Sequence, residues 1–278
     1  MMIRAIPKGR LNAQKDKGLD GLLRTYSLSP LEENKKIIVN GTNRLERMYN
    51  KYDSFLNIKY YARYYDRSDE EKTCFVRNPH LMFHGVCIAD VLSPTEINIF
   101  AQTRLINDRS SHAGLFLSKL IQNSYAAGYN DFQITLGCPI LFPNYLEGKK
   151  NNLLKIVIEE GIGNGGEHLT FVDLTVSGRC KSIGNWTSHS SITAYGDVAK
   201  YSCHQARDSI FTFHGKVCLD DGYGPPYTSY AEQSQRCVFK TSDLETLQHF
   251  VKKIDANGHK IFFIHPDGRE ELKREDHG

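Results

Sequence analysis

Several features that mark other classes of protein are missing from this 278-residue sequence. No apolar run approaches the roughly 20 residues that a helix needs to cross a bilayer. The first ten residues contain no apolar core of the kind found in signal peptides. The seven cysteines are odd in number and form no Cys-x-x-Cys pair. We therefore expect a cytoplasmic protein without membrane contact, with reduced thiols and with Cys138, Cys180 and Cys237 buried as small apolar side chains.

Motifs for catalysis are missing as well. The sequence contains no His-Glu-x-x-His zinc motif, no Walker phosphate-binding loop and no Gly-x-Ser-x-Gly nucleophile motif. The Gly-rich segment 161–166 follows a predicted strand and does not open a helix, so we interpret it as a loop rather than a phosphate site. The balance favours a protein without a cofactor and without catalytic activity.

A short apolar-x-apolar pattern recurs along the second half of the chain. Each copy is five residues long, and the copies occupy 132–136, 156–160, 174–178, 192–196, 211–215 and 237–241. The steps between their fifth positions are 24, 18, 18, 19 and 26 residues. A near-constant step of this length is typical of a stacked coil in which each rung is one strand plus its turns. We predict a mainly β fold built on a single-stranded parallel β-solenoid of about six rungs over residues 129–242.

The alternation within each copy predicts which side chains face the interior. Because strand side chains point to opposite faces in turn, Val176 should lie inside and Thr175 outside. One interior ladder should contain Ile158, Val176, Ala194 and Phe213, and a second should contain Phe132, Ile156, Leu174, Ile192 and Phe211. The Gly at the fifth position of three copies should end the strand at a turn with positive φ. Ser191, Ser209 and Ser234 should bond locally to the turn backbone.

The segments on either side of the repeat are predicted to cover its ends. Before it, we expect strands near 81–86 and 97–101, then a helix from Ser110 or Ser111 that ends at Gly128. After it, Ser242 and Glu245 match a capping box at the start of a helix. A strand at 260–264, a turn at 265–268 and a charged, solvated tail should follow. The predicted organisation is therefore a basic, irregular arm (1–42), a helical or mixed cap (43–128), the solenoid (129–242) and a helix-strand cap with its tail (243–278).

Positive charge is concentrated at the start of the chain. Residues 1–67 hold 14 Lys and Arg against seven Asp and Glu, a balance of +7, whereas the whole chain carries +3 and residues 68–278 therefore carry −4. A helix capped by Asn43 is expected to run into a segment in which basic and aromatic residues interleave, a pattern that suits phosphate contacts with base stacking. An aromatic packing face with solvated basic residues is the alternative. The candidate RNA-contacting residues are Lys59, Tyr60, Arg63, Tyr64 and Arg67.

Histidines supply the best candidates for a metal site. His189, His204 and His214 fall on or beside the repeat, and outward-facing His on adjacent rungs would stand about 5 Å apart. A metal needs three or four such ligands. The spacing of these residues in the sequence is irregular, so we expect no metal.

The layout of the repeat resembles two known families. Apolar-x-apolar-x-Gly followed by a Ser before the next strand resembles the GXGXG right-handed β-helix, which ends the large subunit of glutamate synthase and forms much of one formylmethanofuran dehydrogenase subunit. Gly184 matches the second Gly of that repeat, whereas Tyr201 and Ser202 stand where the next one is expected. The resemblance covers residues 130–242 and implies a rigid scaffold that packs against partners. Every sixth residue from Ile156 to Ile210 instead resembles the hexapeptide pattern of left-handed β-helix enzymes, except that His168, Trp186 and His204 replace small aliphatic residues.

Three hypotheses for the function follow from these observations. The first is a non-catalytic β-solenoid scaffold or binding protein that docks to a protein partner or to itself. The second is an RNA- or ribosome-associated factor that uses the basic N-terminal region. The third is a metal-dependent enzyme built on a left-handed β-helix. We favour the first, because the repeat is the clearest feature and no catalytic motif accompanies it.

Overall fold

The computed structural model describes a subset of the chain: 44–56, 68–78, 82–83, 85–105, 111–199, 202–217, 231, 233–254 and 256–276. Contacts divide the chain into two units, Met1–Asn50 and Lys51–Gly278. The arm predicted at 1–42 and all five candidate RNA-contacting residues lie outside the described residues. Within the described part, residues 44–56 are helical, and no helix is long and apolar enough to span a membrane.

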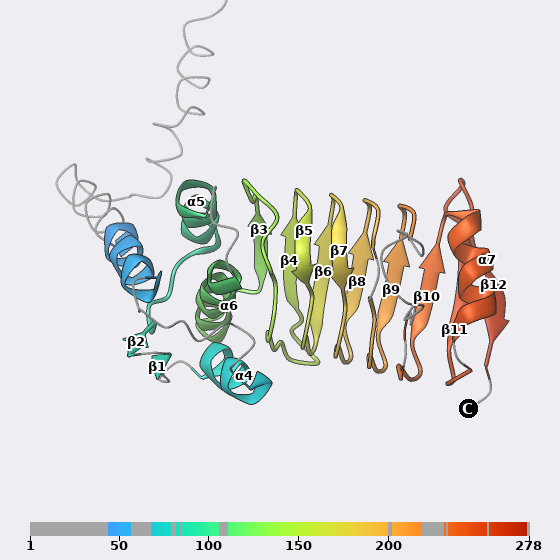
Figure 1. Ribbon diagram of the computed structural model, residues 1–278, viewed down its shortest axis with the longest axis horizontal. Helices are drawn as coiled ribbons and strands as arrows, with labels where there is room; N and C mark the ends of the chain where they lie inside the picture. Colours follow the sequence, from blue (N-terminus) through green and yellow to red (C-terminus); the bar gives the residue numbers. More distant parts are fainter. Residues whose placement is uncertain are drawn as a thin grey trace, which may run out of the picture. The chain divides into compact units, whose positions relative to one another are not determined.

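A parallel β-solenoid of about five turns dominates the second unit and confirms the predicted fold class. Its main sheet has eight strands, of which seven run parallel and lie side by side in chain order in Figure 1. The seven parallel strands are β3 (Asp131–Ile134), β4 (Leu154–Ile158), β6 (Val172–Val176), β8 (Ser191–Ala194), β9 (Ile210–Phe213), β10 (Val238–Thr241) and β11 (Lys260–Ile264). The eighth is the antiparallel edge strand β12 (Glu270–Glu275). Both predicted interior ladders are confirmed, since their members pair in register and all are fully buried.

The predicted register is wrong at one rung. The pattern placed Cys237 opposite Phe211, but Phe239 pairs with Phe211 and Thr241 with Phe213. Cys237, Phe239 and Thr241 are all fully buried, so three successive inward positions fit the same alternation. A shift of two residues keeps every side chain on its own face, and the period of two therefore cannot detect it.

Each turn of the coil has two further faces besides the main sheet. The second face contains β5 (Ile162–Gly165) paired with β7 (Cys180–Ile183), and isolated bridges extend it from Cys180 to Val198 and on to Val217. The third face is a row of single-residue parallel bridges that links Glu147, Thr170, Ser188, Arg207 and Gln235. The six-residue spacing seen in the sequence corresponds to these successive faces.

Glycine at the fifth repeat position serves close packing rather than positive φ. Gly178, Gly196 and Gly215 are not among the glycines with positive φ, which corrects the prediction. A Cβ on Gly196 would lie 2.4 Å from the carbonyl carbon of Gly178, and one on Gly215 would lie 2.4 Å from that of Gly196. Backbones of successive rungs therefore approach each other along this glycine column too closely for any side chain.

Serines at the corner before the main sheet bond between rungs. The Ser190 hydroxyl accepts a hydrogen bond from the Val172 N–H (3.0 Å), and the Ser209 hydroxyl accepts one from the Ser190 N–H (3.3 Å). Each hydroxyl donates in turn to a carbonyl two residues earlier, on Ser188 and Arg207. These buried hydroxyls satisfy backbone groups where the chain bends. Ser209 bonds locally as predicted, whereas on the rung before it the bonding residue is Ser190 and not the predicted Ser191.

The first rung is covered by helices. They are α4 (Asp69–Arg77), α5 (Pro94–Arg104) and α6 (Ser111–Ala126), with a hairpin of β1 (Met82–Phe83) and β2 (Val86–Cys87) between the first two. The strand predicted at 97–101 is wrong because Ser93 and Glu96 form a capping box with Pro94 at the first helical position, which starts α5. The predicted helix before Gly128 is confirmed as α6, which has buried residues on every side. In Figure 1, α5 and α6 stand next to β3.

The last rungs are covered by α7 (Leu244–Lys253) and β12. Phe250 of α7 packs its ring against Phe213 (5.8 Å) and Phe239 (5.7 Å). The N-cap is Asp243, which accepts from the Thr246 N–H at 2.8 Å, and not Ser242 as the sequence predicted. The tail predicted to be charged and solvated is indeed charged and exposed, but most of it forms the strand β12, in which five of six residues are charged. A charged terminal strand of this kind discourages further strand pairing at the sheet edge.

Candidate functional site

Aromatic rings stack along the corner that precedes the third face. The Tyr145 and His168 rings lie 4.8 Å apart, and the His168 and Trp186 rings 4.9 Å apart at an angle of 6°. All three residues have positive φ, which is uncommon for non-glycine residues. Their N–H groups donate to carbonyls of the next rung at 2.7–2.9 Å. Ring stacking and these hydrogen bonds therefore offset the backbone strain of the corner.

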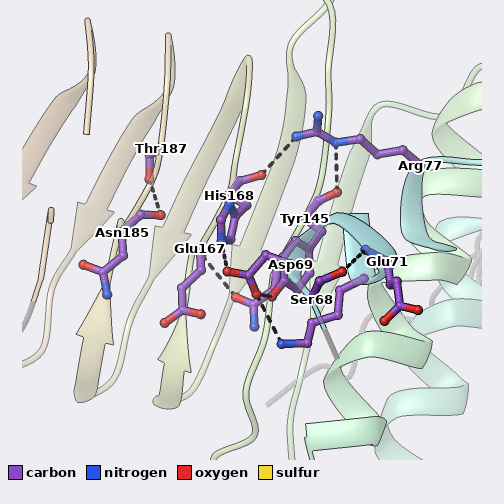
Figure 2. Close-up of polar contacts among 11 residues, drawn as sticks. Ser68, Asp69, Glu71, Arg77, Tyr145, Glu167, His168, Asn185 and Thr187 are labelled. Carbon is purple, nitrogen blue, oxygen red and sulfur yellow. Dashed lines mark hydrogen bonds and ion pairs between the residues drawn. The ribbon is translucent and has the colours of Figure 1, made fainter. Parts of the chain in front are cut away.

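Helix α4 covers the beginning of this corner. The Asp69 carboxylate accepts a hydrogen bond from the Tyr145 hydroxyl (3.0 Å) and lies 3.6 Å from Nε2 of His168 (Figure 2). Arg77, at the other end of α4, donates to the carbonyls of Tyr145 (3.3 Å) and His168 (3.2 Å) and pairs with Glu147 (3.3 Å). The helix is thus held on the first two rungs of the third face by charges at both of its ends.

Burial and hydrogen bonding set the protonation of this cluster. Burial lowers the pKa of His168, although the Asp69 carboxylate acts in the opposite direction, so the imidazole is neutral at neutral pH. Burial acts to raise the pKa of Asp69, but hydrogen bonds from Lys72 and Tyr145 outweigh it and the net pKa is lowered. Burial raises the pKa of Glu167, which lies beside His168, while a hydrogen bond with Asn185 opposes the rise.

A carboxylate next to a neutral imidazole is an arrangement used in general base catalysis. Among the described residues, however, no hydroxyl or thiol hydrogen bonds to the His168 ring. The contacts of Asp69 and Arg77 instead join α4 to the coil. We interpret the cluster as the attachment point of the cap helix.

Lys119 of α6 is the most strongly perturbed cation among the described residues. Its side chain is fully buried, and burial lowers its pKa to about 8. Perturbed groups of this kind are candidates for functional residues. The ammonium group nevertheless donates to the carbonyls of Val76 (3.4 Å) and Asn78 at the C-terminal end of α4. Lys119 therefore stabilises carbonyls that the helix leaves without intrahelical partners.

Beyond α4 the third face is open and forms a groove. Its lining residues are Trp186, Thr187, Ser188, Gln205, Arg207, Gln233 and Gln235. Arg207 carries the single formal charge in this set and is exposed. Gln205 donates to Gln233 at 2.7 Å and so joins two rungs along the rim. The groove is polar, and Arg207 is the one cation among its lining residues.

The outer face of the main sheet presents a different surface. Residues 191–195 and 210–214 contain no Asp, Glu, Lys or Arg. Tyr195 is 55% exposed and Ile210 is 40% exposed, and the Tyr195 ring stacks on His214 at 4.6 Å. The outward side chains Thr175, Thr193 and Thr212 pair in register beside them. We call this surface, made by the outward residues of 191–195 and 210–214, the sheet patch.

The three histidines considered as candidate metal ligands each contact a different aromatic ring. His189 stacks on Phe171 (5.1 Å), His204 lies edge-on to Trp186 (5.7 Å) and His214 stacks on Tyr195. In the described ranges, no group of three or more His, Cys, Asp or Glu residues is placed to hold a metal ion.

Sequence reasoning missed the residues that attach α4 to the coil and the cation of the groove. Asp69 and Arg77 lie on a helix that was not predicted, although Ser68 followed by three acidic residues is a helix-start signal. Arg207 was missed because a row of single-residue bridges has no strand pattern in the sequence. Trp186 was noticed as a departure from the hexapeptide pattern, and the structure explains it as one ring of the stacked corner.

Comparison with known proteins gives no match to a family model, to a curated protein or to a solved structure. The resemblance to the GXGXG domain stays a prediction from the sequence.

Proposed function

We propose that this protein is a non-catalytic binding protein whose solenoid docks a protein partner on the sheet patch. The observation that carries the proposal is the exposure of Tyr195 and Ile210 in an uncharged patch of the parallel sheet. Tyrosine and apolar side chains in a surface region depleted of charge are typical of the centre of a protein interface. Charged residues of neighbouring strands, such as Lys155, Asp173 and Lys240, surround the patch and would supply a polar rim.

The covered ends of the coil favour a partner at its side. Helix α5 meets β3 at one end, where Asn98 accepts a hydrogen bond from the Thr135 N–H at 2.9 Å. Helix α7 and the charged strand β12 cover the other end. Stacking of one coil on the end of another copy is disfavoured by these caps, so the lateral surface is where docking would occur.

The test is capture of partners from native lysate with the full-length chain as bait. We expect Tyr195→Asp combined with Ile210→Asp to lose a specific partner that the wild type and the control Arg179→Gln retain. Nuclease treatment should leave the captured partner unchanged. Loss of every captured protein on nuclease treatment, or equal capture by both variants, would contradict the proposal, and a dimer seen by light scattering would identify a second copy as the occupant.

The RNA- or ribosome-associated function is kept as the second candidate. It rests on the balance of +7 in residues 1–67. A nucleic-acid contact made by this region should weaken steeply with salt, because each neutralised phosphate releases a counterion. Gel-shift titrations between low and physiological salt, with residues 1–42 present or deleted, test this candidate independently of the sheet patch.

A further inference from the structure

The third face carries charges of opposite sign at different rungs. Its outward row runs Glu147, Thr170, Ser188, Arg207 and Gln235, with successive residues on adjacent rungs about 4.8 Å apart. At the first of these positions α4 supplies the complementary charge, since Arg77 pairs with Glu147 and reaches Thr170 (3.5 Å). In Figure 2 the next rung, marked by Asn185 and Thr187, receives none of the contacts drawn from α4.

Arg207 is the cation of this row and is not paired within the described residues. No described carboxylate lies within ion-pair distance of its guanidinium. The neighbouring Asp208 senses the Arg207 charge, but its carboxylate is held by two hydrogen bonds from Arg236 at 2.7 and 2.8 Å. Within the described part of the chain the Arg207 guanidinium thus has no acidic partner, and its planar donor geometry is well suited to bind a carboxylate.

The rest of the groove suits a polypeptide rather than a nucleic acid. Side-chain amides of Gln205, Gln233 and Gln235 line it, and amides both donate and accept hydrogen bonds as a peptide backbone requires. Trp186 is 39% exposed, but His168 already stacks on its ring at 4.9 Å and His204 lies edge-on to it at 5.7 Å. Nucleic-acid binding would also need several cations for phosphates, whereas this groove contains one.

We propose that the open part of the third face binds an acidic peptide segment of a partner protein, with an Asp or Glu carboxylate on Arg207 and the peptide backbone on the glutamine amides. The site lies on a different face from the sheet patch and goes beyond the function proposed above. The groove would thus bind a segment of another protein on the later rungs, just as the first rungs bind helix α4 of the same chain.

The experiment measures fluorescence anisotropy of a labelled twelve-residue peptide of alternating Glu and Ser, with a Gln and Ser peptide as the neutral control. We expect full-length wild type to bind only the acidic peptide. Arg207→Gln should weaken binding at least about tenfold, because a charge-assisted hydrogen bond is lost. Arg179→Gln, an exposed Arg outside the groove, should leave the affinity unchanged, and Gln233→Ala should reduce it by a smaller factor.

Three outcomes would overturn the proposal: no binding of the acidic peptide by wild type at millimolar concentration, equal affinity for the neutral peptide, or equal affinity of wild type and Arg207→Gln. Single-stranded RNA that competes with the peptide and depends more strongly on Arg207 would assign the groove to nucleic acid instead. Melting curves of each variant establish that the fold is intact. The Tyr195→Asp and Ile210→Asp variant should still bind the peptide, so failure of the sheet patch and failure of the groove are separate results.

Discussion

At the scale of the residue, buried titratable groups determine how the fold responds to pH. His259 is fully buried, and its Nδ1 accepts a hydrogen bond from the Cys237 N–H at 3.0 Å, so its proton lies on Nε2. Burial lowers its pKa, with Asp276 acting to raise it and Arg274 to lower it. Protonation of Nδ1 would place its N–H against the N–H of Cys237, so that two hydrogen-bond donors face each other. The native state therefore requires a neutral imidazole at this position.

Acidification should destabilise the protein through His259. Below a pH of about 6.5 the unfolded chain binds a proton at this histidine that the folded chain does not bind until its lower pKa is reached. The free energy of unfolding should therefore fall as the pH decreases from about 6.5 to that lower value. His259→Asn keeps an acceptor near the position of Nδ1 and should flatten this part of the pH profile. Urea unfolding of both proteins between pH 5 and 8 checks the difference, and parallel profiles would contradict the assignment.

Cysteine reactivity should follow burial. Burial raises the pKa of Cys180 to about 12 and that of Cys237 to about 11, and it also raises the pKa of Cys203. Because the thiolate is the reactive form, iodoacetamide at pH 8 should leave these three thiols unmodified in the native protein while it labels the exposed Cys74. Peptide mass spectrometry before and after unfolding in urea measures this. Native labelling of Cys180 at the rate of Cys74 would show that the coil opens locally.

At the scale of the element, close backbone packing restricts the glycine column (Gly178, Gly196 and Gly215) to residues without a side chain. Gly196→Ala would place a methyl group against the backbone of the preceding rung, which cannot move without disturbing the main sheet. We expect a loss of roughly 1–3 kcal/mol, in the range of overpacked cores. Ser177→Ala, at an exposed position in the same stretch of the coil, is the control and should change stability by less than about 0.5 kcal/mol. Denaturant unfolding gives both values, and equal effects would mean that the rungs adjust their spacing.

Strand alternation makes a second prediction at this scale. Val176 is fully buried in the interior ladder, and its neighbour Thr175 points outward. Val176→Asp buries an unpaired carboxylate and should prevent folding, whereas Thr175→Asp should be tolerated. Soluble expression and circular dichroism of the two variants distinguish these outcomes. Similar behaviour of both variants would be incompatible with the observed register.

The main-sheet strands were predictable because each buries alternate side chains for four or five residues, which leaves a period of two in the sequence. Helix α5 was mistaken for a strand because Ile97, Ile99 and Ala101 alternate, whereas the deciding signal was the cap formed by Ser93 and Glu96. Strand β12 escaped because its residues are nearly all charged and show no alternation of apolar side chains. It pairs with β11 through the backbone and through ion pairs such as Lys260–Glu275 at 2.7 Å. The apolar pattern of a sequence indicates which side chains are buried. It does not detect elements that are defined by a helix cap or by pairing at a sheet edge.

At the scale of the whole molecule, the candidate sites depend on registers that no local pattern contains. Tyr195 and Ile210 come from adjacent rungs, as do Gln205 and Gln233, and each pair shares a surface because the coil stacks these rungs on each other. The row from Glu147 to Arg207 spans residues 60 positions apart in the sequence. The architecture was therefore predictable from the sequence. The surfaces proposed to bind partners were not, because they depend on which residues the stacked rungs place side by side.

Because equivalent residues of β6 and β8 are 18 positions apart, one whole rung can be deleted from the coil without a change of register. Deletion of residues 173–190 would join Val172 to Ser191, and the strand so formed would present Ile192 to Ile156 in the register that Leu174 now occupies. Helix α5 and helix α7 contact the terminal rungs, so both would keep their partners. We expect the shortened chain to fold with a lower melting temperature, as circular dichroism would show. Arg207 would then stand one rung nearer to Thr170, so the length of the coil sets the distance between cap and groove in whole steps of about 4.8 Å.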